Sequence, residues 1–493
     1  MNSRCFVRWS LAACLAVCGA TPLAMAQHAK KPAPASQPSI QPTSQPTSQP
    51  ASPPGRDRWK RQMQQRMDAL TREMKAMRAK YDKLRPGQWQ KKLSHEIDVL
   101  AEEIGKLEHR HPIPEHEHGA HHLSQLYGRG PDTVLKLYGA KAGFSVGGYG
   151  EVLLGMHVHD RQRGEHNTAD FLRYVQYFGY KFSEKLFINA ELEIEHSSTE
   201  HGGELTVEFA YAEYLLHPML NLRAGVLLMP VGWLNEVHEP TTYHGVLRPD
   251  VERVVLPSTW SELGVGLFGR LPGGLTYKLY FVTALDATRF SPEGWSEARQ
   301  RVAAAKFDDF GGVLRLDYSW HGKAVFGASC YVGGADHNQF VGFNVTALLA
   351  EAHAQVRTHG LELRALGAFG TVFGARELSL ALYPESGTER DLIARHIYGW
   401  YAEVAYDLWP LVGSSLRYLA VFARFEMYDT QADLPEVGGE REHHREMAKR
   451  VFDVGLTFKP HPQIVLKVDL REYWNAAGTP AVDTVYIGGG FMY

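Results

Sequence analysis

Three features are scarce in this chain of 493 residues: cysteine, a charge excess of either sign, and long hydrophobic runs. Lysine and arginine total 52 against 55 aspartates and glutamates, a formal net charge of −3, so no basic field predicts binding to nucleic acid. The mean hydropathy is −0.28, and no later segment has the roughly 20 consecutive apolar residues that a transmembrane helix needs. A helical membrane protein is therefore excluded.

The beginning of the chain explains most of its cysteines. Two arginines precede an apolar run at 11–20 and an A-x-A cleavage site at 24–26, which is the pattern of a secretory signal peptide over residues 1–26. A lipoprotein-type cut inside the apolar run is the alternative, but it would leave almost no apolar run before it. Removal of the signal leaves Cys330 alone, so we expect an exported chain without an intrachain disulfide.

The next two segments are a spacer and a heptad pattern. Residues 27–55 consist mainly of Pro, Ser, Gln, Thr and Ala, which predicts a disordered linker. Residues 56–109 carry two seams of apolar residues, formed by Trp59, Met63, Met67, Leu70, Met74, Met77, Tyr81 and Leu84, and by Trp89, Leu93, Ile97, Leu100, Ile104 and Leu107. Either the two helices fold back as a hairpin on the same chain, or they join an intermolecular bundle. A stripe this narrow favours other helices as partners, so we expect an α-helical coiled coil that holds a homotrimer.

The connector at 110–133, with the residue before it, is rich in histidine. Six imidazoles lie close together in the sequence, at His109, His111, His116, His118, His121 and His122. Imidazoles at this density bind divalent metals such as Zn²⁺, Cu²⁺ or Ni²⁺, but the prolines and glycine among them predict a flexible segment. We interpret it as a solvated connector, with adventitious metal binding as the alternative, and expect no other cofactor.

The rest of the chain has a hydrophobic period of two. In one run, Ile188, Ala190 and Leu192 share one face, whereas Glu191 and Glu193 share the other, as in an amphipathic strand. Sixteen such runs are predicted within 134–493, at 142–158, 169–182, 185–196, 204–216, 219–229, 261–271, 274–285, 309–320, 323–333, 347–357, 361–372, 397–408, 414–428, 450–459, 463–474 and 483–493.

The connections between these runs alternate between short and long. Seven turns, such as 183–184 and 321–322, alternate with eight loops, of which 230–260 is the longest. This asymmetry is typical of an outer-membrane barrel whose short turns are periplasmic. We therefore predict an all-β transmembrane barrel of about 16 antiparallel strands at 134–493, surrounded by lipid of the bacterial outer membrane, with the preceding segments in the periplasm.

The final strand carries a separate signal. Val485, Ile487, Gly489, Phe491 and Tyr493 alternate up to a terminal aromatic residue. This pattern resembles the C-terminal strand by which the barrel-assembly machinery recognises outer-membrane proteins, so that machinery is an expected partner.

Several stretches of the barrel carry motifs. They are GGYGE at 147–151, FINAELEIEH at 187–196, MPVG at 229–232, NEVHEP at 235–240 and KPHPQ at 459–463. With them, residues 143–493 resemble the porin O/porin P family, named for its phosphate-selective members. The resemblance implies a sixteen-stranded trimeric diffusion channel, with the loop 230–260 folded into the lumen as a constriction.

A channel of this kind does no bond chemistry, so its working residues are charges of the lumen and of the constriction. The candidate pore-lining and constriction residues are Glu191, Glu193, Arg223, Glu236, His238, Glu239, Arg248, Arg253, Lys278, Arg315, Arg364 and Arg424. Other charges on the same inner faces are Glu195, Glu208, Glu351, Glu362, Glu403, Glu426, Asp453, Asp469, Arg357, Lys459, Lys467 and Arg471. With both signs present, some of these residues must form interior salt bridges. Glu191 and Glu193 are expected to face loop 230–260 if it folds inward.

The expected function is a porin for small hydrophilic solutes or ions. Phosphate selection in the named family members rests on an arginine ladder and a lysine cluster, whereas loop 230–260 has two arginines and no lysine. A general or weakly cation-preferring channel is therefore as compatible with the residues as one for phosphate-type anions. The rival function is a structural tether, in which the coiled coil spans to the peptidoglycan and the barrel is its anchor. No enzyme is expected, because no HExxH motif occurs.

Overall fold

The computed structural model describes residues 143–159, 166–199, 202–383, 392–412, 417–436, 445–479 and 482–493. The predicted signal peptide, spacer, coiled coil and histidine-rich connector lie outside the described residues. The six histidines considered as metal ligands lie outside them too.

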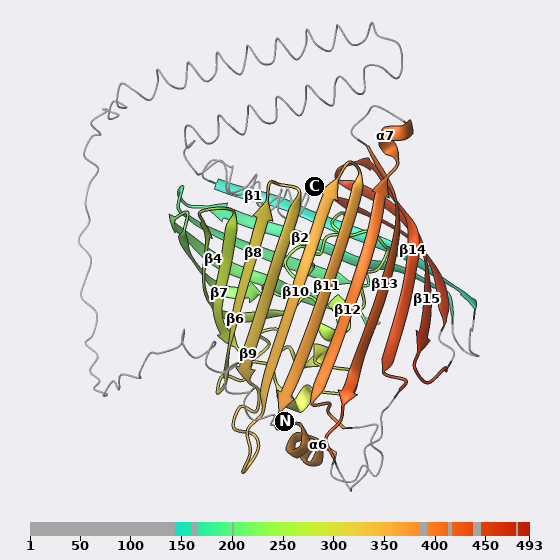
Figure 1. The fold of residues 1–493 in the computed structure, drawn as a ribbon. Helices are drawn as coiled ribbons and strands as arrows, with labels where there is room; N and C mark the ends of the chain where they lie inside the picture. Colours follow the sequence, from blue (N-terminus) through green and yellow to red (C-terminus); the bar gives the residue numbers. More distant parts are fainter. Residues whose placement is uncertain are drawn as a thin grey trace, which may run out of the picture. The chain divides into compact units, whose positions relative to one another are not determined.

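Sixteen antiparallel strands close into one barrel (Figure 1). Each strand pairs with its neighbours in the chain, and β1 closes the ring by pairing with β16. The strands are β1 (Gly143–His159), β2 (Thr168–Lys181), β3 (Leu186–Glu195), β4 (Leu205–His217), β5 (Leu220–Leu228), β6 (Ser261–Leu271), β7 (Leu275–Thr283), β8 (Phe310–Trp320), β9 (Ala324–Gly334), β10 (Thr346–Thr358), β11 (Leu361–Phe373), β12 (His396–Asp407), β13 (Tyr418–Asp433), β14 (Ala448–His461), β15 (Ile464–Asn475) and β16 (Asp483–Met492). The predicted barrel of sixteen antiparallel strands is thereby confirmed.

The two faces of each strand are inverted relative to a water-soluble protein. On β3, Ile188 is 44% exposed on the outer face, whereas Asn189 and Glu191 on the inner face are 3% and 1% exposed. Large apolar side chains are exposed on the outside of nearly every strand, and charged side chains are buried inside. This arrangement is typical of a barrel that meets lipid on its outer face.

Short and long connections lie at opposite ends of the barrel, because successive strands run in opposite directions. In Figure 1 the β12–β13 turn, which contains α7 (Trp409–Val412), lies at the upper end, and the β11–β12 loop, which contains α6 (Ala375–Leu382), lies at the lower end. Among the described residues, no helix is both long and apolar enough to cross a bilayer.

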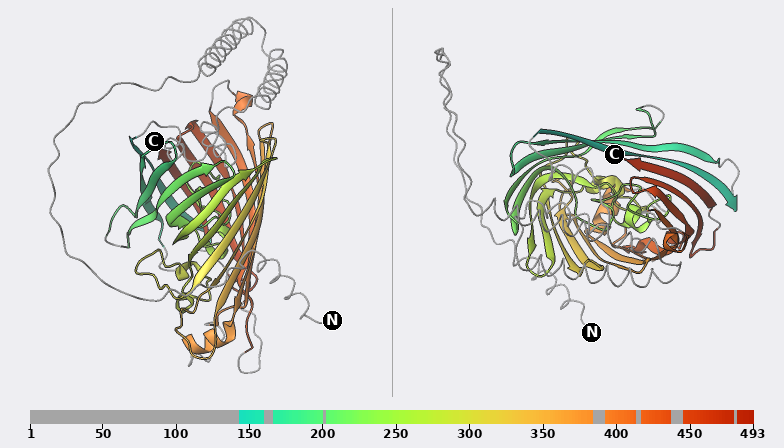
Figure 2. Two further views of the ribbon diagram at one scale, coloured as in Figure 1. Left: turned by 90° about the vertical axis from the view of Figure 1, so that its left-hand side faces the viewer. Right: turned by 90° about the horizontal axis from the view of Figure 1, so that it is seen from above.

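Two of the long loops fold into the ring of strands (Figure 2). The first, residues 229–260, is called the inner loop below and contains η1 (Val251–Val255); the second, residues 284–309, contains η2 (Ala287–Arg289) and η3 (Ser296–Ala298). Side chains of both loops and of the inner wall form one hydrophobic cluster. Within this cluster, Trp260 packs edge-on against Tyr331 of β9, with 4.8 Å between the ring centroids.

Candidate functional site

The inner loop is closed at its base by a glycine and an asparagine. Gly232 has a φ of 67°, and a Cβ there would lie 2.8 Å from Oε2 of Glu252, so any other residue would be strained and would displace this carboxylate. The Asn235 amide donates to the carbonyls of Met229 (2.7 Å) and Trp260 (3.0 Å), and its Oδ1 accepts from the Trp260 N–H (2.8 Å). These contacts join the two ends of the loop.

Arginine and lysine side chains of the barrel wall donate hydrogen bonds to backbone carbonyl groups of the inner loop. A loop inside a barrel forms few sheet hydrogen bonds, so its buried carbonyl groups need other donors. The contacts are Arg173 to His238 O (3.1 Å), Arg315 to Gly232 O, Lys459 to Thr241 O (2.7 Å), Arg364 to Thr242 O (3.2 Å), Lys467 to Gly245 O (2.8 Å), and Arg471 to Leu247 O (3.0 Å) and Arg248 O (2.9 Å). The donors belong to β2, β8, β11, β14 and β15, so the loop is held from several sides.

Two fully buried arginines form the centre of an ion-pair network on β12 to β15. Arg424 lies 3.0 Å from Glu403, 2.9 Å from Glu426 and 2.5 Å from Asp453, and Arg471 lies 3.0 Å from Asp453 and 3.2 Å from Asp250 of the inner loop. Burial alone would raise the pKa of Asp250, but the positive charges of Arg253 and Arg471 outweigh it and lower the pKa below its usual value. The charged form of Asp250 is therefore stabilised by these two arginines.

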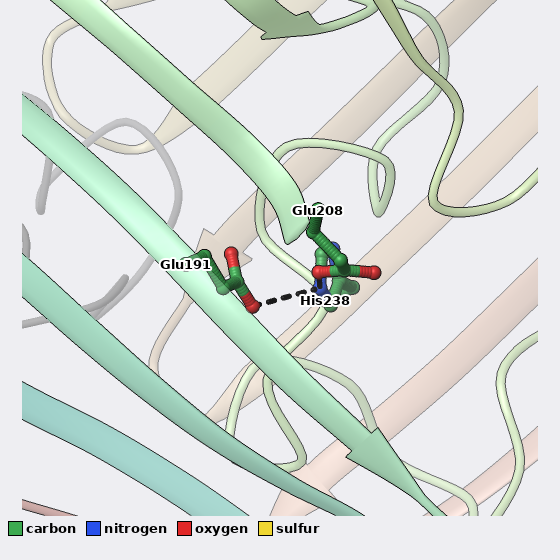
Figure 3. A group of neighbouring side chains, drawn as sticks. All are labelled: Glu191, Glu208 and His238. Atoms are coloured by element: carbon green, nitrogen blue, oxygen red, sulfur yellow. Dashed lines mark hydrogen bonds and ion pairs between the residues drawn. The ribbon is translucent and has the colours of Figure 1, made fainter. Parts of the chain in front are cut away.

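On the other side of the barrel lies an acid–histidine cluster made of Glu191 on β3, Glu208 on β4 and His238 of the inner loop (Figure 3). His238 Nε2 lies 3.0 Å from Glu208 Oε2 and 3.8 Å from Glu191 Oε1, and no member is more than 2% exposed. His238 Nδ1 lies 3.1 Å from the carbonyl oxygen of Asn235. One ring nitrogen therefore faces two carboxylates and the other faces a backbone acceptor.

Further carboxylates surround this cluster. Arg173 binds Glu151 through a bond of 2.7 Å from Nε and lies 3.6 Å from Glu193, so one guanidinium serves two acids. Glu239 accepts a hydrogen bond of 3.0 Å from the Tyr177 hydroxyl. Acidic groups outnumber basic ones in this part of the barrel.

The twelve predicted pore-lining and constriction residues lie mostly within these networks. Eight are buried, namely Glu191, Glu193, His238, Glu239, Arg248, Arg315, Arg364 and Arg424. Arg223 pairs with Glu213, and Lys278 pairs with Glu236, while the side chain of Arg253 is 42% exposed. The expected interior salt bridges are present, and Glu191 faces the inner loop. That any of these residues contacts a passing solute stays a prediction.

Several residues of the site were not among those candidates. Asn235, Asp250, Arg173 and Glu151 hold the inner loop or the acids beside it. The inward direction of Glu151 could have been predicted from the sequence, because the period of two places it on the same face as buried Tyr149. Asp250 and Asn235 lie in a loop without periodicity, so their contacts had no such signal.

No family model matches the chain. A protein of Aquifex aeolicus (strain VF5), described as uncharacterized, is 35% identical over 355 residues, which are 69% of this chain and 78% of the relative. The chain belongs to the family of this Aquifex protein.

Solved barrels give weaker matches. A loop-deletion mutant of OmpT, an outer membrane protein of Vibrio cholerae, matches 72% of this chain and 100% of its own, with a TM-score of 0.47 and 10% identity. An anion-selective porin from Comamonas acidovorans matches 72% of this chain and 100% of its own, with a TM-score of 0.46 and 12% identity. The DcaP channel of Acinetobacter baumannii has a TM-score of 0.43 and 12% identity over 72% of this chain and 99% of its own. The strand pairing of the chain itself defines the barrel.

Proposed function

We propose that the chain forms an outer-membrane channel through which small hydrophilic solutes or ions diffuse passively. The observation that carries this proposal is a closed sixteen-stranded ring with apolar residues outside, charges inside and a long loop folded into the ring. A sixteen-stranded barrel is wide enough for an aqueous channel, and an internal loop would reduce that width to a constriction.

The outer surface supports a place in the membrane. Aromatic side chains are exposed toward the ends of several strands, among them Trp320 (50%), Tyr318 (43%) and Tyr406 (39%), as expected for rings at the level of the lipid headgroups. On β16, Ile487 and Phe491 are 42% and 40% exposed on the outer face. This pattern supports the proposal that the barrel-assembly machinery recognises the final strand.

The wall contacts bear on selectivity. Within the described residues, the buried arginines on β8, β11, β13 and β15 are bound to carboxylates or to loop carbonyls. They are therefore poorly suited to serve as a ladder for phosphate. We propose a mixed-charge channel with a weak preference, and keep phosphate-type anions as an outcome of the test.

Two further proposals concern the segment before the barrel. The coiled coil at 56–109 is proposed to hold three chains together, and the connecting segments would lie in the periplasm. The alternative role for this segment is a structural tether to the cell wall, with the barrel as its anchor.

Flux measurements test the proposal. Liposomes that contain the purified full chain should admit small sugars at rates that fall with solute size. Reversal potentials in a KCl gradient should show a weak preference, and replacing chloride by phosphate should not increase the current. Failure to admit the smallest sugars and ions would contradict a channel. A current in phosphate larger than the current in chloride would instead support phosphate selectivity.

A further inference from the structure

The acid–histidine cluster of Glu191, Glu208 and His238 has more buried carboxylate oxygens than hydrogen-bond donors. His238 Nε2 is within hydrogen-bonding distance of Glu208, but neither oxygen of Glu191 has a hydrogen-bond partner, although the residue is 1% exposed. One oxygen each of Glu208 and Glu239 is buried without a partner as well. Buried carboxylate oxygens without partners are energetically costly, so something is expected to satisfy them.

A proton on His238 Nε2 can form a hydrogen bond with only one of these carboxylate oxygens. A single N–H points to one acceptor, and Glu208 at 3.0 Å is the nearer of the two carboxylates. Glu191 at 3.8 Å would keep both oxygens unpaired. A metal ion differs from a proton because it accepts a lone pair from each of the three side chains at once.

We propose that Glu191, Glu208 and His238 form a binding site for a divalent transition-metal ion that links the inner loop to the barrel wall. Within the described residues, this is the group whose carboxylate and imidazole donor atoms converge, with all three ligand atoms within 4.8 Å of one another. Ligand atoms around a tetrahedral zinc ion are about 3.3 Å apart when each bond to zinc is about 2.0 Å. This value lies between the observed distances from His238 Nε2 to Glu208 (3.0 Å) and to Glu191 (3.8 Å).

The second ring nitrogen supports the same assignment. His238 Nδ1 lies 3.1 Å from the Asn235 carbonyl and donates its proton to that oxygen, so Nε2 is the ring nitrogen left to bind a metal between the two carboxylates. Metal-binding histidines commonly donate their other N–H to a backbone carbonyl in this way, which fixes the ring orientation. Imidazole together with carboxylates suits Zn²⁺ and similar ions better than Ca²⁺, which prefers an all-oxygen shell.

His353 on β10 provides an internal contrast. Its Nδ1 lies 2.8 Å from Glu351 and its Nε2 lies 2.9 Å from Asp317, so each ring nitrogen faces one carboxylate. A doubly protonated imidazole satisfies both acids without a metal. Buried acids beside a histidine are therefore not sufficient for a site, and His353 is a matched control.

The experiment must separate this site from the histidines at 109–122, which would also bind zinc. The full chain with those six histidines replaced by asparagine is purified, stripped with EDTA, loaded with ZnCl₂ and passed over a desalting column. We expect about one Zn²⁺ per chain, bound by three protein ligands. H238Q or E208Q in this background should weaken zinc binding by at least about tenfold, whereas H353Q should leave it unchanged.

X-ray absorption at the zinc edge keeps the test decisive if a variant fails to fold. In the chain without the six histidines it should show one imidazole and oxygen ligands at about 2.0–2.1 Å. Heat-modifiable mobility on gels reports folding of each variant. Absence of bound zinc in the folded chain, or full retention in folded H238Q and E208Q, would overturn the proposal and leave the cluster as a protonated histidine clamp. None of these readouts depends on channel activity.

Discussion

Arg471 on β15 donates from Nη1 to Oδ1 of Asp250 in the inner loop across 3.2 Å, and neither side chain is more than 5% exposed. The two residues are 221 positions apart in the sequence. Arg471 also donates to two carbonyl oxygens of the same loop. The position of the inner loop is therefore set by charges on the wall as well as by its own turns.

R471M should strongly destabilise the barrel, because Asp250 and Asp453 would stay buried without this cation. Removal of one partner of a buried ion pair costs about 3–5 kcal/mol, and we expect a loss in that range in the free energy of unfolding. The control is R357M: Arg357 pairs with Glu362 at 2.9 Å, but its side chain is 40% exposed, so the expected loss is below about 1 kcal/mol. Urea unfolding in lipid vesicles, followed by tryptophan fluorescence, measures both, and equal losses would contradict the proposed role of Arg471.

Acid should weaken the same contact. Because its arginines lower the pKa of Asp250 below the unfolded value of about 3.9, this group stabilises the fold above about pH 4. That contribution is lost as the pH falls below this value and the carboxylate is protonated. The urea midpoint of the wild type should drop in this range more steeply than that of D250N, and parallel pH profiles would refute the assignment.

G232A should disturb the base of the inner loop. The residue has a φ of 67°, and an added Cβ would lie 2.8 Å from Glu252 Oε2. Gly322 in the β8–β9 turn is a matched control, because its φ is 65° but open space surrounds its Cβ position. Both variants lose about 1 kcal/mol through backbone strain, and G232A should lose more because of the clash. Similar unfolding free energies for the two variants would show that the loop accommodates the methyl group.

N235A should release the inner loop without opening the barrel. Three hydrogen bonds to Met229 and Trp260 disappear, which should lower the free energy of unfolding by about 2 kcal/mol. Trypsin should then cut the folded protein within the loop, after Arg253. The control N189A removes a similarly buried amide that makes one contact of 3.5 Å to Tyr211, and should stay resistant. Equal resistance of N235A would show that the wall contacts alone hold the loop.

The strands could be predicted because burial on one face and lipid on the other impose a strict period of two. The predicted run 261–271 has the same limits as β6 (Ser261–Leu271). The predicted run 414–428 and β13 (Tyr418–Asp433) differ at both ends. Residues 413–416 lie outside the described residues, and β13 continues through the mainly polar residues at 429–433, which carry no hydrophobic alternation.

The site was predictable only in part. The period of two placed Glu191 and Glu208 on inner faces, and His238 was a candidate constriction residue within the motif at 235–240. That His238 approaches both acids depends on the path of the inner loop across the barrel, which no local pattern encodes. For the same reason the partnership between Arg471 and Asp250 could not be anticipated from either residue's neighbours.

Planar-bilayer recording of the purified full chain tests the central claim most directly. A diffusion channel should produce stepwise, ohmic increases in current at low voltage, and heat-denatured protein should produce none. A folded protein that inserts into the bilayer but never conducts would contradict the proposed channel and favour a structural role for the barrel.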